Sequence, residues 1–352
     1  MSSWFDRFVK TWANTGVSTD PSDAQANAGF SFLGAAPPSV ELFNAMFKWN
    51  DQKDTYLYNQ MLSVFAWGGQ TASETNPNTL RDAIIARQRI TLTVDTNYYV
   101  DVAGNDTTGN GTVGNPWKTI AWAYTYVLLY VDPAGHNVNI QLKSPGTYAA
   151  ATFNIPLLGY FSITGDKLNP KLYIIKNTNG QAIGLGQSVV LTLQGVALEA
   201  IGSTNPTIGD PGGYGLLVVR SALCYIDEVA MGSCTLTQIV VGEGGVVWPA
   251  RNGAKLYIYG PSTNGNCMAA VTAGQINLNS MTITFQGNPT FAGATLAAER
   301  AGSLYAYGMT FVGTSVGAKY NVNLNGILYT NGNSVNIPGT TAGVVVSGGQ
   351  LT

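Results

Sequence analysis

Residues 191–196 read Leu-Thr-Leu-Gln-Gly-Val, and the same six-residue frame returns five more times before residue 352. In each copy, apolar and variable positions alternate, and a small residue usually follows the fourth position. The other copies are Cys224-Tyr-Ile-Asp-Glu-Val, Leu256-Tyr-Ile-Tyr-Gly-Pro, Ile276-Asn-Leu-Asn-Ser-Met, Leu304-Tyr-Ala-Tyr-Gly-Met and Val322-Asn-Leu-Asn-Gly-Ile. Alternation with a period of two is typical of a β-strand with one buried face.

The spacing of the copies predicts the architecture. Successive copies are separated by 33, 32, 20, 28 and 18 residues, and strand repeats of about 20 to 50 residues are typical of solenoids. The fifth position, which is often glycine, suits a tight corner because glycine adopts left-handed backbone angles readily. We therefore expect a parallel β-solenoid over residues 131–352. A β-sandwich is the alternative, since it also contains many short strands.

The frame also predicts which side chains face the interior. The first and third positions should point inward, so that Leu191, Ile226, Ile258, Leu278 and Leu324 line one common core. The second and fourth positions should form one outer column. Its members are Thr192, Gln194, Tyr225, Asp227, Tyr257, Tyr259, Asn277, Asn279, Tyr305, Tyr307, Asn323 and Asn325. Tyrosine rings can stack on sugars and amides can bond their hydroxyls, so the column is either a glycan-binding face or an interface between identical chains.

Composition excludes several classes of protein. Charged residues make up 10% of the chain and the net charge is −2, which leaves no basic surface for nucleic acid. No apolar run approaches the roughly 18 residues that a membrane-spanning helix needs, so membrane insertion is not expected. The three cysteines have no metal-ligand spacing, and His136 has no second histidine with which to build a catalytic pair. We expect no metal and no cofactor.

Residues 1–90 have helical apolar spacing and form a separate region. The spacing predicts three short helices. The first contains Trp4, Phe8 and Trp12, the second begins after Ser39, and the third covers Thr79 to Arg89. The candidate attachment residues of this region are Trp4, Phe8, Trp12, Phe43, Phe47 and Trp49. Such small helices bury little surface alone, so we expect copies of this chain or another protein to complete them. A small globular cap is the alternative.

Residues 98–123 contain a recognisable series of motifs. Val100-Asp101 ends a predicted strand, Gly104-Asn-Asp106 makes a loop, and Pro116-Trp-Lys-Thr-Ile120 leads into a predicted helix over Lys118–Tyr130. This series resembles the entry segment of pectate-lyase-like right-handed parallel β-helix proteins. The resemblance implies that residues 91–130 supply an entry strand and a helix that caps the open end of the stack.

The N-terminal region has a second resemblance. Residues 20–44, beginning Asp20-Pro-Ser-Asp, together with Trp49-Asn-Asp-Gln-Lys-Asp54, resemble the attachment regions of bacteriophage tail spikes and tail fibres. The resemblance implies a homotrimeric virion protein that binds a phage tail or baseplate protein through residues 1–90. Its β-helix would face a host surface polysaccharide or lipopolysaccharide. The absence of a secretory layout at Met1–Arg7 fits assembly in the host cytoplasm.

Tail spikes of this type often cleave polysaccharide, and hydrolysis usually requires two carboxyl groups roughly 5 to 9.5 Å apart. Asp227, predicted to face outward, and Glu228, at a corner, are the candidate pair, with Glu199 or Glu243 as a partner from a neighbouring coil. Adjacent acids are usually only solvated, and residues 131–352 provide only eight or nine coils. We therefore expect a receptor-binding or structural tail protein, with a depolymerase, either hydrolase or lyase, as the alternative. A secreted enzyme is disfavoured, because the aspartates form no cluster for Ca²⁺.

Overall fold

The computed structural model describes residues 89–157, 159–202 and 212–352. The strands of this part of the chain form three long sheets of ten, seven and eight strands and one two-stranded sheet. All pairings between these strands are parallel. The β-sandwich alternative is therefore wrong, because sandwiches are built from antiparallel sheets.

The elements are short, and most strands contain three to five residues. The ten-stranded sheet consists of β2 (Thr96–Val100), β4 (Val138–Leu142), β7 (Phe161–Thr164), β10 (Val190–Gln194), β13 (Leu223–Asp227), β16 (Val246–Pro249), β19 (Gln275–Asn277), β22 (Ser303–Tyr305), β25 (Ile327–Tyr329) and β27 (Gln350–Leu351). The seven-stranded sheet consists of β5 (Gly146–Ala149), β8 (Tyr173–Asn177), β11 (Ala197–Ala200), β14 (Val229–Cys234), β17 (Lys255–Ile258), β20 (Thr282–Phe285) and β23 (Thr310–Val312). The eight-stranded sheet consists of β6 (Ala151–Phe153), β9 (Ile183–Leu185), β12 (Leu216–Val218), β15 (Ile239–Val241), β18 (Met268–Val271), β21 (Thr290–Glu299), β24 (Val316–Asn323) and β26 (Val344–Val345). The remaining elements are β1 (Ile90–Thr91), β3 (Val131–Asp132), helix α4 (Ile120–Tyr130) and the 3-10 helices η3 (Pro170–Leu172) and η4 (Ser334–Asn336).

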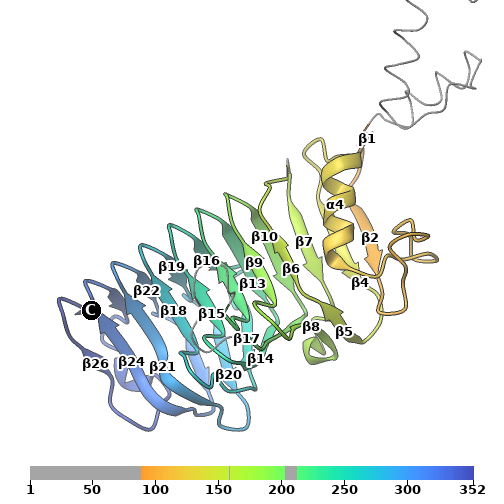
Figure 1. Ribbon diagram of the computed structural model, residues 1–352. Coiled ribbons are helices and arrows are strands. Elements are labelled where there is room, and N and C mark those ends of the chain that lie inside the picture. Colours follow the sequence, from red (N-terminus) through yellow and green to blue (C-terminus); the bar gives the residue numbers. More distant parts are fainter. Residues whose placement is uncertain (1–88, 158, 203–211) are drawn as a thin grey trace, which may run out of the picture. The chain divides into compact units, whose positions relative to one another are not determined.

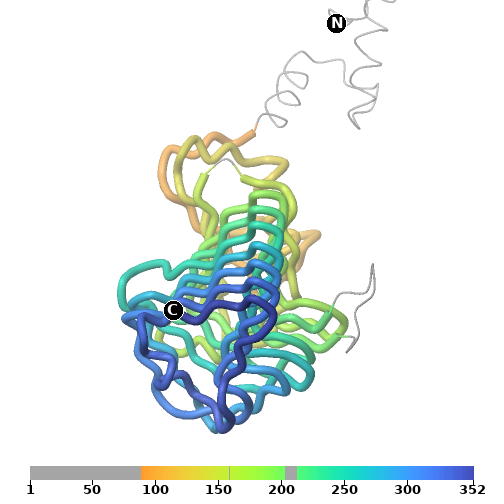
Figure 2. The backbone as a smooth tube through the Cα atoms, turned by 90° about the vertical axis from the view of Figure 1, so that its left-hand side faces the viewer, coloured from red at the N-terminus to blue at the C-terminus, as the bar shows by residue number. Residues whose placement is uncertain are grey.

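The chain visits the three long sheets in a fixed cyclic order. From β4 to β24 it passes from the ten-stranded to the seven-stranded to the eight-stranded sheet and then begins again. Figure 1 shows the strands stacked along one direction, and Figure 2 shows successive passes lying over one another. Nine strands of the ten-stranded sheet follow residue 131, consistent with the eight or nine coils expected. The described part is thus mainly β with several parallel sheets, as a parallel β-helix requires.

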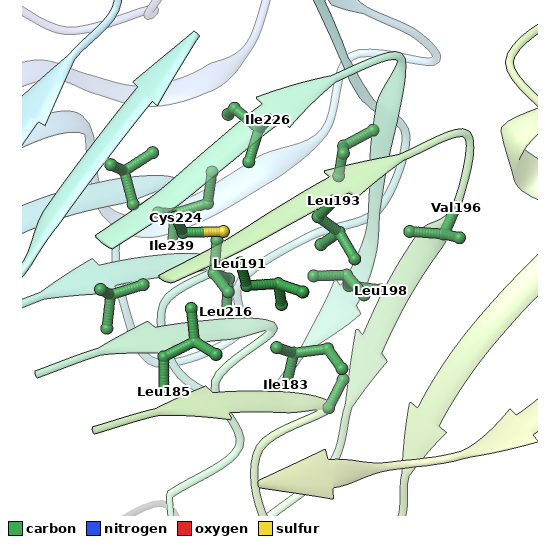
Figure 3. Packing of buried hydrophobic residues seen from close by; sticks show 14 of the residues in the cluster. Ile183, Leu185, Leu191, Leu193, Val196, Leu198, Leu216, Cys224, Ile226 and Ile239 are labelled. Carbon is green, nitrogen blue, oxygen red and sulfur yellow. The ribbon is translucent and has the colours of Figure 1, made fainter. Parts of the chain in front are cut away.

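One apolar core runs between the three sheets. Alternate side chains of β4 are fully buried, and the same alternation recurs in β7 and β10. Leucine, isoleucine and valine side chains from all three sheets point toward one another in Figure 3. Of the residues predicted to line the core, Leu191, Ile226, Ile258 and Leu278 are fully buried members of this cluster. Burial of apolar surface on this scale is the main stabilising contribution to the fold.

Leu324 is an error in the core prediction, because its side chain is 49% exposed. Strand β24 ends at Asn323, and Leu324 and Asn325 then adopt positive φ angles of 47° and 62°. Strand alternation is lost once the backbone leaves the extended region, so the third position of this frame no longer faces inward.

Two kinds of corner connect the sheets. Between the ten-stranded and the seven-stranded sheet, single residues at the fifth frame position have left-handed φ angles, as expected: Gly195 (65°), Glu228 (52°), Ser280 (61°) and Gly308 (63°). The expectation was wrong for the other two fifth positions, Gly260 and Gly326, whose φ angles are not left-handed. Between the eight-stranded and the ten-stranded sheet, the turn has two left-handed residues in succession, for example Arg300 and Ala301 before Gly302. A Cβ atom on Gly302 would lie 2.1 Å from the carbonyl oxygen of Ala270 in the preceding coil. Glycine is therefore required here for close backbone approach.

Helix α4 lies at the β2 end of the stack (Figure 1) and buries Ile120, Ala123, Tyr124 and Val127. It begins two residues later than predicted. The Thr119 hydroxyl accepts a hydrogen bond from the Trp122 backbone at its N-terminus. The Asp106 carboxylate in turn accepts hydrogen bonds from the backbone N–H groups of Lys118 and Thr119, at 2.8 and 3.0 Å. These bonds cap the helix.

Candidate functional site

The predicted outer column does not exist as one surface, because its members are divided among three sheets. Tyr225, Asn277 and Tyr305 lie in the ten-stranded sheet, whereas Tyr257 belongs to β17 of the seven-stranded sheet and Asn323 to β24 of the eight-stranded sheet. Any strand that alternates and then turns sharply satisfies the frame, so the frame matched strands from all three sheets. The short separations of 20 and 18 residues arise from this mixing.

Thr192 and Gln194 lie in β10 and Asp227 ends β13, whereas the other four members of the predicted column lie just beyond strand ends. Tyr259 follows β17, and Asn325 lies in the left-handed turn after β24. Asn279 and Tyr307 follow β19 and β22, and the Asn279 side chain accepts a hydrogen bond of 3.2 Å from the Tyr307 backbone N–H. Only this last pair extends the outer face of the ten-stranded sheet.

Strand register defines the true row on the ten-stranded sheet, which we call the outer row. Its members, in strand order, are Asn97, Asn139, Ser162, Thr192, Tyr225, Trp248, Asn277, Tyr305 and Tyr329. Trp248 and Tyr329 were missed because β16 and β25 do not fit the six-residue frame. The run Val246-Val-Trp-Pro249 was nevertheless a readable strand in the sequence.

The C-terminal half of the outer row is aromatic. Trp248 and Tyr329 are exposed, and Tyr225 and Tyr305 are partly exposed. The rings of Tyr305 and Tyr329 are 6.2 Å apart, and the exposed Tyr307 ring meets Tyr329 edge-on at 5.6 Å. The rings of Tyr305, Tyr307 and Tyr329 therefore form a continuous aromatic surface on the last coils.

The N-terminal half of the outer row forms the floor of a polar groove with a volume of about 490 Å³. Its lining comes from β2, β4, β7 and β10 and from the segments beside them. The lining residues are Asp95, Thr96, Asn97, Asn137, Asn139, Tyr160, Phe161, Ser162, Thr164, Lys167, Thr192 and Gln194. The sequence frame began only at Leu191, so sequence reasoning missed this groove, although Asn139, Ser162 and Thr164 alternate with apolar residues in readable strands.

Asn139 organises the centre of the groove. Its amide nitrogen donates to the side-chain oxygen of Asn97 at 2.9 Å. Its side-chain oxygen accepts hydrogen bonds of 2.9 Å from the hydroxyls of Ser162 and Thr164. At the edge of the groove, Asp95 accepts two bonds of 2.9 Å from Asn137, and these bonds lower the pKa of its carboxyl. His136 lies 3.6 Å from Asp95.

The proposed acid pair is close together but is not open to solvent. Asp227 occupies an outward position of β13, in register with Gln194, as expected, but only 1% of its side chain is exposed. Arg251 covers it, with its Nε 2.7 Å from Asp227 Oδ2, and the backbone N–H of Lys255 binds the other oxygen at 3.2 Å. Glu228 is also buried and is bound by Lys255 Nζ at 3.1 Å and by the Tyr257 hydroxyl at 2.6 Å.

The possible partner acids are also paired. Glu199 binds Lys176 at 2.9 Å and the Tyr259 hydroxyl at 3.0 Å, whereas Glu243 lies 3.4 Å from Arg220. Burial and the bond to Glu228 raise the pKa of Tyr257 to about 12. Tyr257 and Tyr259, predicted as surface residues of one column, instead hold acids of the seven-stranded sheet and the corner beside it.

The described residues contain no group of three or more His, Cys, Asp or Glu side chains that could hold a metal ion. Within the same residues, no helix is long and apolar enough to cross a membrane. Cys224, Cys234 and Cys267 are free and buried, and burial raises the pKa of the Cys234 thiol to about 12.

The predicted attachment residues Trp4, Phe8, Trp12, Phe43, Phe47 and Trp49 lie outside the described residues. No protein-family model, curated protein or solved structure matches the chain.

Proposed function

We propose that this chain is a glycan-binding protein that recognises host surface polysaccharide or lipopolysaccharide through the outer face of its ten-stranded sheet. The observation that carries the proposal is the outer row, in which amides and hydroxyls on the first coils are followed by aromatic rings on the last. Amides and hydroxyls bond sugar hydroxyls, and aromatic faces stack on the apolar faces of sugar rings.

The length of the row favours a polymer over a single sugar. Nine adjacent strands contribute to it, and neighbouring strands lie about 4.8 Å apart, so the row extends over roughly 38 Å. A surface of this length can contact several units of an extended chain at once. Repetition of weak contacts along a polymer raises the overall affinity without any strong single site.

We further infer that the three sheets close into a right-handed parallel β-helix that belongs to a phage tail spike or tail fibre. The cyclic order of strands and the single core support the helix, and parallel crossovers are right-handed in nearly all proteins. The resemblances of residues 20–54 and 98–123 support the virion assignment. In this proposal residues 1–90 bind a tail or baseplate protein, and three copies form the assembled spike.

Receptor binding is favoured over depolymerisation by the state of the acids. Asp227 and Glu228 are buried and bound to Arg251, Lys255 and Tyr257. A carboxyl group that must exchange a proton with a sugar needs access to it. This arrangement fits a structural ion-pair cluster that joins the Asp227–Glu228 corner of one coil to Arg251 and Lys255 of the next.

The test uses the full-length chain and host polysaccharide. Purified protein should bind lipopolysaccharide or capsule extracted from a susceptible host and should block phage adsorption to those cells. It should also co-purify with virions and have the mass of a trimer in solution. Absence of binding to any extracted host glycan would overturn the proposal, and release of oligosaccharides would replace it with the depolymerase.

A further inference from the structure

The polar groove at the N-terminal end of the ten-stranded sheet differs from the rest of the outer row, because it is concave and its polar groups are already ordered. Asn97, Asn139 and Ser162 come from three adjacent strands in direct register. Their mutual hydrogen bonds of 2.9 Å fix the orientation of each side chain before any ligand arrives. Ordered polar groups bind a ligand with a smaller loss of conformational entropy.

The direction of these hydrogen bonds determines which atoms remain for a ligand. Ser162 and Thr164 both donate their hydroxyl proton to Asn139. Each hydroxyl oxygen therefore presents its lone pairs outward as an acceptor. Asn97 uses its oxygen to accept from Asn139, so the two N–H bonds of its amide are the donors on the other side. The groove thus offers acceptors and donors within a short distance, as a sugar with neighbouring hydroxyls requires.

The walls of the groove add an aromatic ring and balanced charge. Tyr160 lines the groove with 69% of its surface exposed, so its ring is available for stacking. Asp95 precedes β2 and Lys167 follows β7. The strands are parallel, so these two charges lie toward opposite ends of the strands. They are the charged side chains of the lining, and together they sum to zero, which gives no preference for a strongly anionic polymer.

We propose that this groove is a binding site for an uncharged, hydroxyl-rich sugar unit, with Asn97, Ser162 and Thr164 bonding its hydroxyls and Tyr160 stacking on its ring. The assignment rests on the proposed glycan-binding function and adds to it a defined position and a ligand class.

The experiment titrates the full-length chain with neutral hexasaccharides (maltohexaose, mannohexaose and chitohexaose) and with anionic hexagalacturonate, by calorimetry and by ligand-observed NMR. At least one neutral hexasaccharide should bind. Tyr160→Ala should weaken that binding roughly tenfold, which corresponds to about 1.4 kcal/mol. The Ser162→Ala, Thr164→Val double variant should weaken it by a similar factor. Leu172→Ala, a truncation of an exposed apolar side chain in η3 outside the outer row, is the control and should leave hexasaccharide binding within twofold.

Three results would overturn the proposal: no neutral hexasaccharide binds, hexagalacturonate alone binds, or the groove variants bind as tightly as the original chain. Host lipopolysaccharide binding, measured in parallel, separates this failure from failure of the proposed function. If host glycan binds equally well to the groove variants, the groove assignment fails while the receptor function stands. If neutral hexasaccharide binds in the groove but host glycan does not bind, the receptor function fails and the groove assignment stands.

Discussion

The two halves of the outer row share one backbone arrangement and differ in chemistry. The first four positions are asparagine, asparagine, serine and threonine, and four of the next five are aromatic. The strands are parallel and in register throughout. The stack therefore provides equivalent outward positions, and the side chains alone decide what each stretch of the surface can bind.

The corner that precedes each strand of this sheet changes at nearly the same place. The residue two positions before the first inward-facing side chain of the strand is Val189 for β10 and Ala222 for β13. It is glycine in each of the next five coils, namely Gly245, Gly274, Gly302, Gly326 and Gly349. In these five coils a Cβ atom would lie 2.1 to 2.4 Å from a carbonyl oxygen of the preceding coil.

Substitution of a corner glycine should have the largest effect on the aromatic half. Gly302→Ala places a methyl group against the backbone of Ala270, which cannot move without shifting a whole coil, so we expect a loss of about 3 kcal/mol in unfolding free energy. Gly308→Ala is the matched control, because it has a positive φ of 63° but open space around it; it should lose only about 1 kcal/mol. Denaturant midpoints measure both. Equal losses would show that backbone angle, and not coil-to-coil contact, explains the glycines.

The ion-pair cluster at the boundary between the halves should come second. Asp227→Ala removes the partner of Arg251 and an acceptor for the Lys255 backbone. Because 52% of the Arg251 side chain is exposed and can be rehydrated, the expected loss is about 2 kcal/mol, below the value for a fully buried pair. Glu243→Ala is the control: it and Arg220 are both more than half exposed, so stability should change by less than about 0.5 kcal/mol. An Asp227→Ala variant as stable as the original chain would show that the ion pair does not stabilise the fold.

Much of the fold follows from local patterns in the sequence. Alternation in segments such as Leu191-Thr-Leu-Gln predicted strands with one buried face, and the Pro116-Trp-Lys-Thr-Ile120 segment predicted the helix that follows it. Both depend on contacts between residues near in sequence or on the period of a strand. The prediction of a common core was right for Leu191, Ile226 and Ile258 for the same reason.

The arrangement of the surface could not be read in the same way. Which sheet a strand joins depends on the lengths of three corners per coil, and a frame of six residues contains only one of them. Tyr257 was therefore placed beside Tyr225, although the two strands belong to different sheets. The five corner glycines were a better guide to sheet membership. Each precedes a strand of the ten-stranded sheet and lies two residues before an inward-facing side chain of that strand. Burial of Asp227 depends on Arg251, 24 residues away, and alternation carries no information about it.

Truncation of single rings should sharpen the contrast between the halves in binding. If the aromatic half stacks on sugar, Trp248→Ala should weaken binding of extracted host polysaccharide roughly tenfold, or about 1.4 kcal/mol. Thr192→Ala, at the polar end of the same row, should weaken it less than threefold, because one hydroxyl bond exchanged with water contributes little. Surface binding assays on immobilised polysaccharide measure both, with thermal unfolding as a check on folding. The reverse order of effects would locate recognition in the polar half.

The smallest expected effect concerns two tyrosines, one from each half of the stack. Burial raises the pKa of Tyr148 to about 12, and burial together with the bond to Glu228 does the same for Tyr257. Because the folded-state pKa is raised, the associated stability is complete below about pH 10, the ordinary value, and is lost as the pH rises toward about 12. Glu228→Gln removes a negative charge beside Tyr257 only. In tyrosinate absorbance titrations of the native protein, this variant should lower the pKa of one tyrosine, and Tyr148→Phe should remove a different late-titrating group. If Glu228→Gln leaves the late titration unchanged, burial alone holds Tyr257 protonated, and the two tyrosines differ in position but not in mechanism.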